Sequence, residues 1–170
     1  MYSLIPLIYN PADKQGAQLK AAEALTLGDW VYTSGSSAVN GIEYQLVRKA
    51  TTGLYTITGT PTTVSQRLGI VFREPQAYRS DDEKDDTEWN AIGISDTCII
   101  FWDGTFRTSR FDSSINAGNP GPGSPLWVNI DGLLSDGTGA GQQANGDRPV
   151  AQLIAYREAG TTDFIDYRIL

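Results

Sequence analysis

Apolar and polar residues alternate along most of the chain after residue 27, with the period of two that is typical of strands lying on a core. In the run IEYQLVRKA (42–50), one face comprises Ile42, Tyr44 and Leu46 or Val47, and the other comprises Glu43, Gln45 and Arg48. In DFIDYRIL (163–170), one face comprises Ile165, Tyr167 and Ile169, and the other comprises Asp166 and Arg168. Similar runs occupy residues 28–35, 53–60, 67–75, 97–112, 125–130 and 148–156. The pattern therefore predicts about eight to ten short strands.

Turn residues separate these runs. Asp103-Gly104 stands between two strand-like arms and predicts a type I′ hairpin turn, the strongest such signal in the chain. Asp131-Gly132 predicts another turn, and the Gly- and Pro-rich segment 113–125 predicts a loop. No repeat of fixed period is present, so a propeller or solenoid is not expected. We expect an all-β fold, a compact barrel or sandwich of short antiparallel strands with long loops.

The first 26 residues differ from the rest. Pro6 and Pro11 interrupt the apolar run 1–14 and disfavour a helix, so this run is expected to be extended. The composition of residues 14–25 suits a short helix, and a loop suits it almost equally. We therefore expect an N-terminal arm at 1–26, with a possible short helix, and a β-rich domain at 27–170. The arm lacks the basic region of a signal peptide, so synthesis in a cytoplasm is the expectation.

Charge narrows the choice of partner. The chain has 170 residues and a net charge of −7, and its 13 basic residues are scattered without a cluster. A nucleic-acid surface needs clustered Lys and Arg to neutralise phosphates, and an anionic membrane attracts basic segments. No apolar run approaches the roughly 20 residues of a membrane span. We therefore expect a protein partner, with neither nucleic acid nor membrane.

The residue types also limit the chemistry. The chain has no histidine, which excludes Ser-His-Asp and Cys-His relays and His metal sites. No P-loop or dinucleotide motif is present. The single cysteine, Cys98, lies in an apolar run and is expected to be a buried, inert thiol. We expect no cofactor, no metal and no catalytic residue. A carboxylate glycosidase stays open only because the sequence cannot place two carboxylates relative to each other.

Two further groups of residues have alternative interpretations. The acidic run 81–88 could be a solvated loop, a Ca²⁺ site, or a rim that complements a basic neighbour. Of the tryptophans, Trp30 and Trp102 lie in alternating strands and are expected in the core. Trp89 and Trp127 border loops and are candidates for an interface, or for a sugar-binding platform.

The order of several short motifs resembles that of small virion proteins of tailed bacteriophages, particularly capsid decoration (cement) proteins. The matching residues are GDWV at 28–31, LGIV at 68–71, LWVNIDGL at 126–133 and PVAQLI at 149–154. The resemblance covers residues 25–170. The chain departs from the pattern in its apolar arm and in the insertions 77–90 and 113–124.

This resemblance implies a structural virion protein, made in the host cytoplasm, that binds the assembled head and bridges subunits of the major capsid protein. It also implies that the protein can form a homotrimer. We expect an apolar docking arm and two interface tryptophans. These residues are Tyr2, Leu4, Ile5, Leu7, Ile8, Tyr9, Trp89 and Trp127. The alternative for the arm is that it folds back onto its own domain. The alternatives for the function are a tail or head–tail connector protein and a carbohydrate-binding module.

Overall fold

The computed structural model describes residues 4–8, 14–51, 68–72, 90–138, 148–158 and 160–170. The elements of this part of the chain are all β-strands, so the expected all-β class is confirmed. The strands are β1 (Leu4–Ile8), β2 (Lys14–Ala21), β3 (Leu25–Thr26), β4 (Trp30–Val39), β5 (Ile42–Lys49), β6 (Gly69–Phe72), β7 (Ala91–Ile92), β8 (Thr97–Phe101), β9 (Thr105–Thr108), β10 (Pro125–Val128), β11 (Leu134–Ser135), β12 (Ala151–Arg157) and β13 (Phe164–Ile169).

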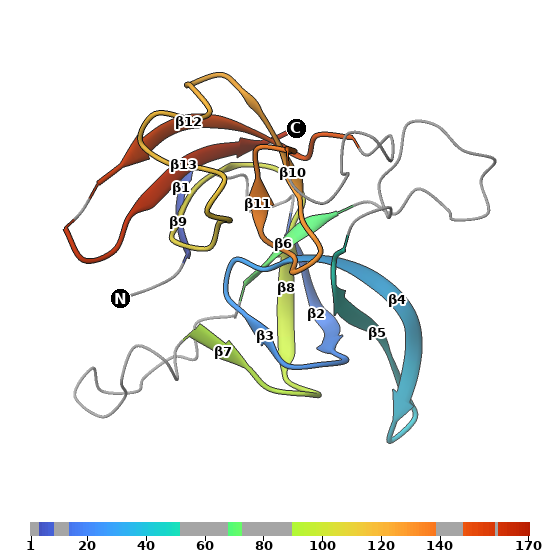
Figure 1. Ribbon diagram of the computed structural model, residues 1–170. Helices are drawn as coiled ribbons and strands as arrows, with labels where there is room; N and C mark the ends of the chain where they lie inside the picture. The colour runs from blue at the N-terminus through green and yellow to red at the C-terminus, as the bar shows by residue number, and fades with distance from the viewer. Residues whose placement is uncertain (1–3, 9–13, 52–67, 73–89, 139–147, 159) are drawn as a thin grey trace.

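Two β-structures make up most of the fold. Strands β2, β5, β4, β6 and β8 close into a five-stranded barrel, in which β2 runs parallel to β5 and the other pairs are antiparallel. Strands β1, β9, β13, β12, β10 and β11 form a six-stranded sheet in that order. This sheet lies above the barrel in Figure 1, and β3 and β7 form a small separate sheet at the lower left, beside the barrel. The fold thus contains the expected barrel and a second sheet.

A chain of aromatic rings connects the barrel to the six-stranded sheet. Phe72 in β6 contacts Phe101 in β8, with ring centroids 5.6 Å apart, and Phe101 contacts Phe106 in β9 at 5.3 Å. Phe106 contacts Tyr167 in β13 at 6.1 Å, and Tyr167 contacts Trp30 in β4 at 6.3 Å. Each such pair contributes about 0.5–1.5 kcal/mol beyond the burial of its surface. The barrel and the sheet therefore share one core.

The hairpin predicted at Asp103-Gly104 is wrong. Strand β8, before the turn, pairs with β2 and β6 in the barrel, whereas β9, after it, pairs with β1 and β13 in the six-stranded sheet. The turn is therefore a corner between the two structures. The turn also lacks the type I′ backbone, since Gly104 has a φ of 129° and Asp103 does not have a positive φ.

The short helix considered for residues 14–25 is also wrong, because residues 14–21 form β2. This strand has β8 on one side and β5 on the other, and its Leu19 and Ala21 side chains are each only 1% exposed. Helix propensity differs little between ordinary residues, so strand pairing on two sides overrides it. Residues 4–8 likewise form an edge strand of the six-stranded sheet, antiparallel to β9.

Several sequence predictions are confirmed. Strands form within the runs beginning at residues 28, 42, 67, 97, 125, 148 and 163. The turn at Asp131-Gly132 lies between the antiparallel strands β10 and β11.

Two side chains expected in the core, Trp30 and Cys98, are fully buried. Burial, with a smaller effect of Asp96, raises the pKa of the Cys98 thiol to about 12. Trp102 is only partly buried against the core. The run 53–60 and the acidic run 81–88 lie outside the described residues.

The outer face of the six-stranded sheet carries a carboxylate shared by two arginines. Ile165, Tyr167 and Ile169 face the core as expected, and Asp166 on the opposite face is nevertheless 3% exposed. Arg107 in β9 and Arg157 in β12 donate hydrogen bonds to its two oxygens at 2.7 and 2.6 Å. Burial alone would raise the pKa of Asp166, but these hydrogen bonds outweigh burial and lower it. Asp166 therefore ties three neighbouring strands together as an anion.

We expect Asp166→Asn to destabilise the protein by about 2 kcal/mol at pH 7, because it removes charge-assisted hydrogen bonds. The folded-state pKa lies below the unfolded value of about 3.9, so the carboxylate stabilises the fold above that pH and stops doing so as the pH falls through the folded pKa. Urea unfolding between pH 2 and 7 should show the difference between the variant and the wild type shrinking below about pH 4. A difference independent of pH would contradict this account.

The hydroxyl of Tyr167 generates a second prediction. Tyr167 is fully buried, and its hydroxyl has no hydrogen-bond partner among the described residues. A buried unpaired hydroxyl costs about 1–3 kcal/mol, and burial also raises the pKa of Tyr167. We expect Tyr167→Phe to leave the free energy of unfolding unchanged or to increase it by about 1 kcal/mol. If urea unfolding instead shows that the substitution lowers the free energy of unfolding by about 1 kcal/mol or more, the hydroxyl must have a hydrogen-bond partner.

Candidate interaction surface

The β4–β5 hairpin extends beyond the barrel. The end of this hairpin lies at the lower right of Figure 1. Residues 35–43 are all exposed. Asn40 and Gly41 form the turn with φ values of 51° and 78°, the left-handed values that a type I′ turn requires. Val39 and Ile42 close the ribbon as a cross-strand pair and are 43% and 50% exposed.

One face of this hairpin carries apolar residues along β5 from its end to the barrel, with Val39 opposite Ile42 and Ser37 opposite Tyr44. Cross-strand partners share a face, and so do alternate residues along a strand, so Val39, Ile42, Tyr44 and Leu46 lie together. We call these four residues the outer stripe. Val47 points the other way and is fully buried. The expectation that Ile42 and Tyr44 face a core is therefore wrong, because Ile42 lies beyond the barrel and the core-facing residue of β5 is Val47.

Two basic side chains border the outer stripe. Lys20 in β2 lies next to Leu46 in the parallel pairing, and its Nζ stands 4.4 Å from the centroid of the Tyr44 ring. Arg48 follows Leu46 on the same face of β5, and its Nε donates to Ser34 Oγ at 3.1 Å. Glu43 points to the reverse face, where it accepts a hydrogen bond from Ser36 Oγ at 2.6 Å. Of the residues that β4 and β5 place on the stripe's face, none is acidic.

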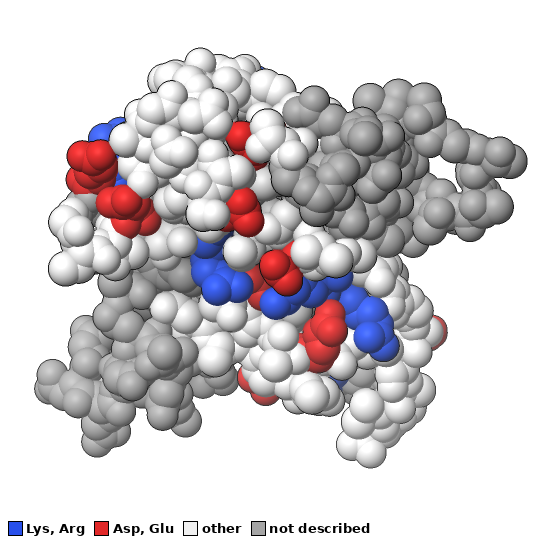
Figure 2. Space-filling model, viewed as in Figure 1, with Lys and Arg blue, Asp and Glu red and all other residues white. Residues whose placement is uncertain are grey.

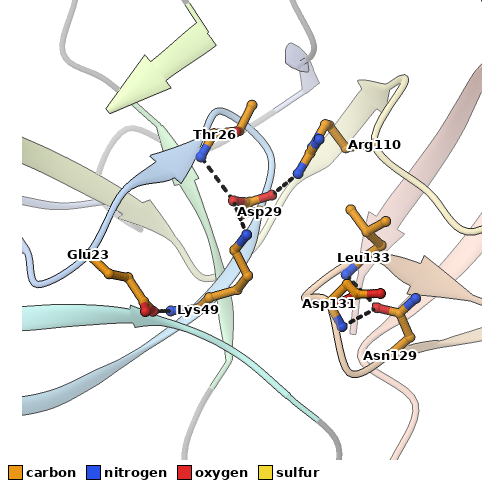
Figure 3. Close-up of polar contacts among 8 residues, drawn as sticks. All are labelled: Glu23, Thr26, Asp29, Lys49, Arg110, Asn129, Asp131 and Leu133. Atoms are coloured by element: carbon orange, nitrogen blue, oxygen red, sulfur yellow. Dashed lines mark hydrogen bonds and ion pairs between the residues drawn. The ribbon is translucent and has the colours of Figure 1, made fainter. Parts of the chain in front are cut away.

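A buried carboxylate fixes the root of the hairpin (Figure 3). Asp29, immediately before β4, is fully buried. Its Oδ1 lies 2.6 Å from Arg110, which follows β9, and its Oδ2 lies 3.3 Å from Lys49 Nζ at the end of β5. The backbone N–H of Thr26 also donates to Oδ2 at 2.9 Å. One carboxylate thus joins both strands of the hairpin to the segment that leads out of the six-stranded sheet.

The β10–β11 turn packs against the same root. The Asn129 side chain accepts hydrogen bonds from the backbone N–H groups of Asp131 and Leu133 (Figure 3), and the Gly132 carbonyl accepts one from Trp30 N at 3.1 Å. Gly132 has a φ of +73°, and a Cβ there would lie 2.5 Å from Lys49 Cγ. Only glycine allows both this backbone conformation and this close contact with Lys49. Many charged side chains lie in a band between the six-stranded sheet and the barrel (Figure 2).

The residues that the sequence analysis placed at an interface differ in how exposed they are. Leu4 is 2% exposed and belongs to the core, so at this position the arm lies on its own domain. Leu7, in the same strand, is 41% exposed. Ile5 and Ile8 belong to β1, but their side chains lie outside the described part of the structure. Trp127 is partly buried in β10. Tyr2, Tyr9 and Trp89 lie outside the described residues.

The hairpin surface was not found from the sequence, although a signal for it is present. Asn40-Gly41 between Val39 and Ile42 is as strong a short-range indication of a two-residue hairpin as Asp103-Gly104. The alternation upstream of it is obscured by the small residues of SGSSA at 34–38. A bulge between Thr33 and Ser36 also shifts the register of β4. The strand expected at 28–35 is in fact ten residues long, Trp30–Val39.

Asp136, Asp166 and Tyr156 have shifted pKa values, and each makes side-chain hydrogen bonds within the fold. Among the described residues, no group of three or more His, Cys, Asp or Glu could hold a metal ion. Burial would raise the pKa of Asp136, but hydrogen bonds from Thr138 and Asn119 lower it, as the arginines do for Asp166. A glycosidase acid needs a raised carboxyl pKa, which is the opposite shift. A hydrogen bond to Asp163 raises the pKa of Tyr156 to about 12, with burial adding to it.

No helix in the described ranges is long and apolar enough to cross a membrane.

We expect Asp29→Asn to destabilise the protein by about 3 kcal/mol, because it leaves Lys49 and Arg110 without their shared anion. This corresponds to a decrease in Tm of roughly 10 °C for a chain of this length. Asp131→Asn is the matched control, since it removes the same charge from an exposed position in the nearby turn, and it should change stability by less than about 0.5 kcal/mol. Equal melting temperatures for the two variants would show that the Asp29 junction does not hold the fold together.

Comparisons of the chain with protein-family models, with curated proteins and with solved structures found no match. A function for this protein therefore has to be argued from its own residues and surfaces.

Proposed function

We propose that this protein is a structural component of a phage virion, a capsid decoration protein that binds the outer surface of the assembled head and bridges subunits of the major capsid protein. The observation that carries the proposal is the projecting β4–β5 hairpin, which exposes paired apolar side chains on an otherwise well-packed domain. Contiguous exposed apolar side chains typically mark a surface that binds another protein. The order of the GDWV, LGIV and LWVNIDGL motifs also supports this class of protein.

The GDWV motif has a physical role that fits such a protein. Asp29 holds the root of the hairpin, and Trp30 and Val31 are fully buried in the core. The motif thus fixes the direction in which the hairpin leaves the domain. A rigid projection lowers the entropic cost of binding, because fewer conformations are lost when the contact forms.

A decoration protein acts by mass action. It stabilises the head because it binds the assembled state and not the free subunits. Many copies, or several linked in an oligomer such as the homotrimer implied by the resemblance, multiply the effect of a modest single contact. Leu7, exposed on the edge strand β1, is the described residue of the predicted arm that is open to such a contact.

The test is co-sedimentation with empty heads of a phage that carries this coding sequence, preceded by light scattering of the free protein. We expect a monomer or small oligomer that pellets with expanded heads and not with free capsid subunits. Expanded heads should also unfold at a higher temperature when the protein is bound. Spontaneous assembly into rings or tubes would favour a tail or connector protein. Sugar-dependent quenching of tryptophan fluorescence without head binding would favour a carbohydrate-binding module.

A further inference from the structure

We propose that the outer stripe of the β4–β5 hairpin is the surface that contacts the head, and that its partner is an apolar groove rimmed by carboxylates on the capsid protein. This inference rests on the proposed function and specifies which surface performs it. It starts from the location of the stripe, on a ribbon whose end, residues 35–43, is exposed to solvent.

The apolar character of the stripe requires an explanation. Leu7, Ile94, Ile130 and Ile154 are also exposed, but they lie in separate strands and turns. Single exposed apolar residues are normal on a soluble protein. Val39 and Ile42 instead form a cross-strand pair that continues into Tyr44 and Leu46. Burying such a pair in a groove provides the desolvated centre that protein interfaces need.

The charge around the stripe indicates the chemistry of the partner. The chain as a whole carries a net charge of −7. On the face of the stripe, however, Lys20 and Arg48 border the apolar residues, and the acidic Glu43 points to the reverse face. Interfaces match opposite potentials, so a groove with carboxylates at its rim is the complementary surface. A contact between the stripes of two copies would instead bring like charges together.

The hairpin is also held in one conformation before binding. The type I′ turn at Asn40-Gly41 closes it, and hydrogen bonds from Ser36 and Arg48 side chains connect β4 to β5. At the root, Lys49 and the segment before Trp30 are joined through Asp29. A pre-organised ribbon loses little conformational entropy on docking, so its few apolar contacts can be converted into affinity.

The first experiment measures binding of Val39→Thr/Ile42→Thr to expanded empty heads by co-sedimentation. Threonine keeps the β-branched shape and removes apolar surface, so the hairpin should persist and Tm should not change. We expect the Kd to rise at least tenfold. Ile154→Thr is the matched control, because it removes an isoleucine that is 44% exposed from β12, and it should bind within twofold of the wild type.

The second experiment tests the charge. Lys20→Glu should raise the Kd about tenfold at low ionic strength, and the effect should diminish as salt is added, because salt screens exposed charges. Arg168→Glu makes the same change in charge at an exposed position of β13 and should have little effect. An equal effect of both changes would show that only net charge matters and would overturn the proposed acidic rim.

The outcomes separate the two proposals. If the wild-type protein does not pellet with heads, the proposed function fails. If it pellets and the Val39/Ile42 variant pellets equally well, the stripe is not the contact, and the decoration role stands. If light scattering shows that the wild type self-associates and that this variant does not, the stripe binds a second copy, which also overturns the inference.

A labelling measurement keeps the proposal testable if the double variant misfolds. Cys98 is the single cysteine of the chain and is buried, so Ile42→Cys provides the one accessible thiol. Maleimide labelling of this variant should slow when heads are bound, whereas labelling of Ile154→Cys should not. Equal labelling of Ile42→Cys with and without bound heads would show that the stripe stays exposed and would overturn the proposal.

Discussion

The buried negative charge of Asp29 is the constraint on which the arrangement of this protein depends. The carboxylate has no access to solvent and must be satisfied by protein groups, because a buried unpaired charge is very costly. Lys49, Arg110 and the Thr26 backbone supply those groups from three separate parts of the chain. The barrel strands and the segment after β9 therefore have to converge on one point, and this requirement fixes the root of the hairpin.

The shared core acts together with this charge. The rings from Phe72 through Phe101, Phe106 and Tyr167 to Trp30 pass from one β-structure to the other without a polar break. Apolar packing of this kind is strong but weakly directional, whereas the Asp29 junction and the Asp166 clamp are directional. The combination explains how a domain without a disulfide can hold a projecting ribbon in a defined direction.

The sequence identified strands well and their partners poorly. Alternation located β5 and β13 because side-chain period is a local property. It could not show which face of β5 meets the core. Alternation alone suggests that Ile42 and Tyr44 face inward, but the hairpin extends past the barrel and leaves Ile42 exposed.

Pairing depends on contacts between distant residues: Asp103-Gly104 has the residues of a hairpin turn, yet β8 and β9 belong to different sheets. Likewise, β2 is a strand because β5 and β8 flank it, which nothing within residues 14–25 indicates. The exposed hairpin could have been found from Asn40-Gly41, whereas the Asp29 junction joins residues up to 81 positions apart and has no local signal.

The position of β13 has a consequence for how the chain is made. This strand, Phe164–Ile169, lies in the interior of the six-stranded sheet, between β9 and β12, and β1 pairs with β9 at an edge of the sheet. During translation the sheet therefore stays incomplete until residue 169 has left the ribosome. The barrel strands are synthesised earlier, but Phe101 and Trp30 pack on rings that the sheet supplies. Contacts between residues so far apart in sequence form slowly. Until β13 is added, nascent chains should thus expose apolar strand edges of this sheet, a kind of surface that aggregates or binds chaperones.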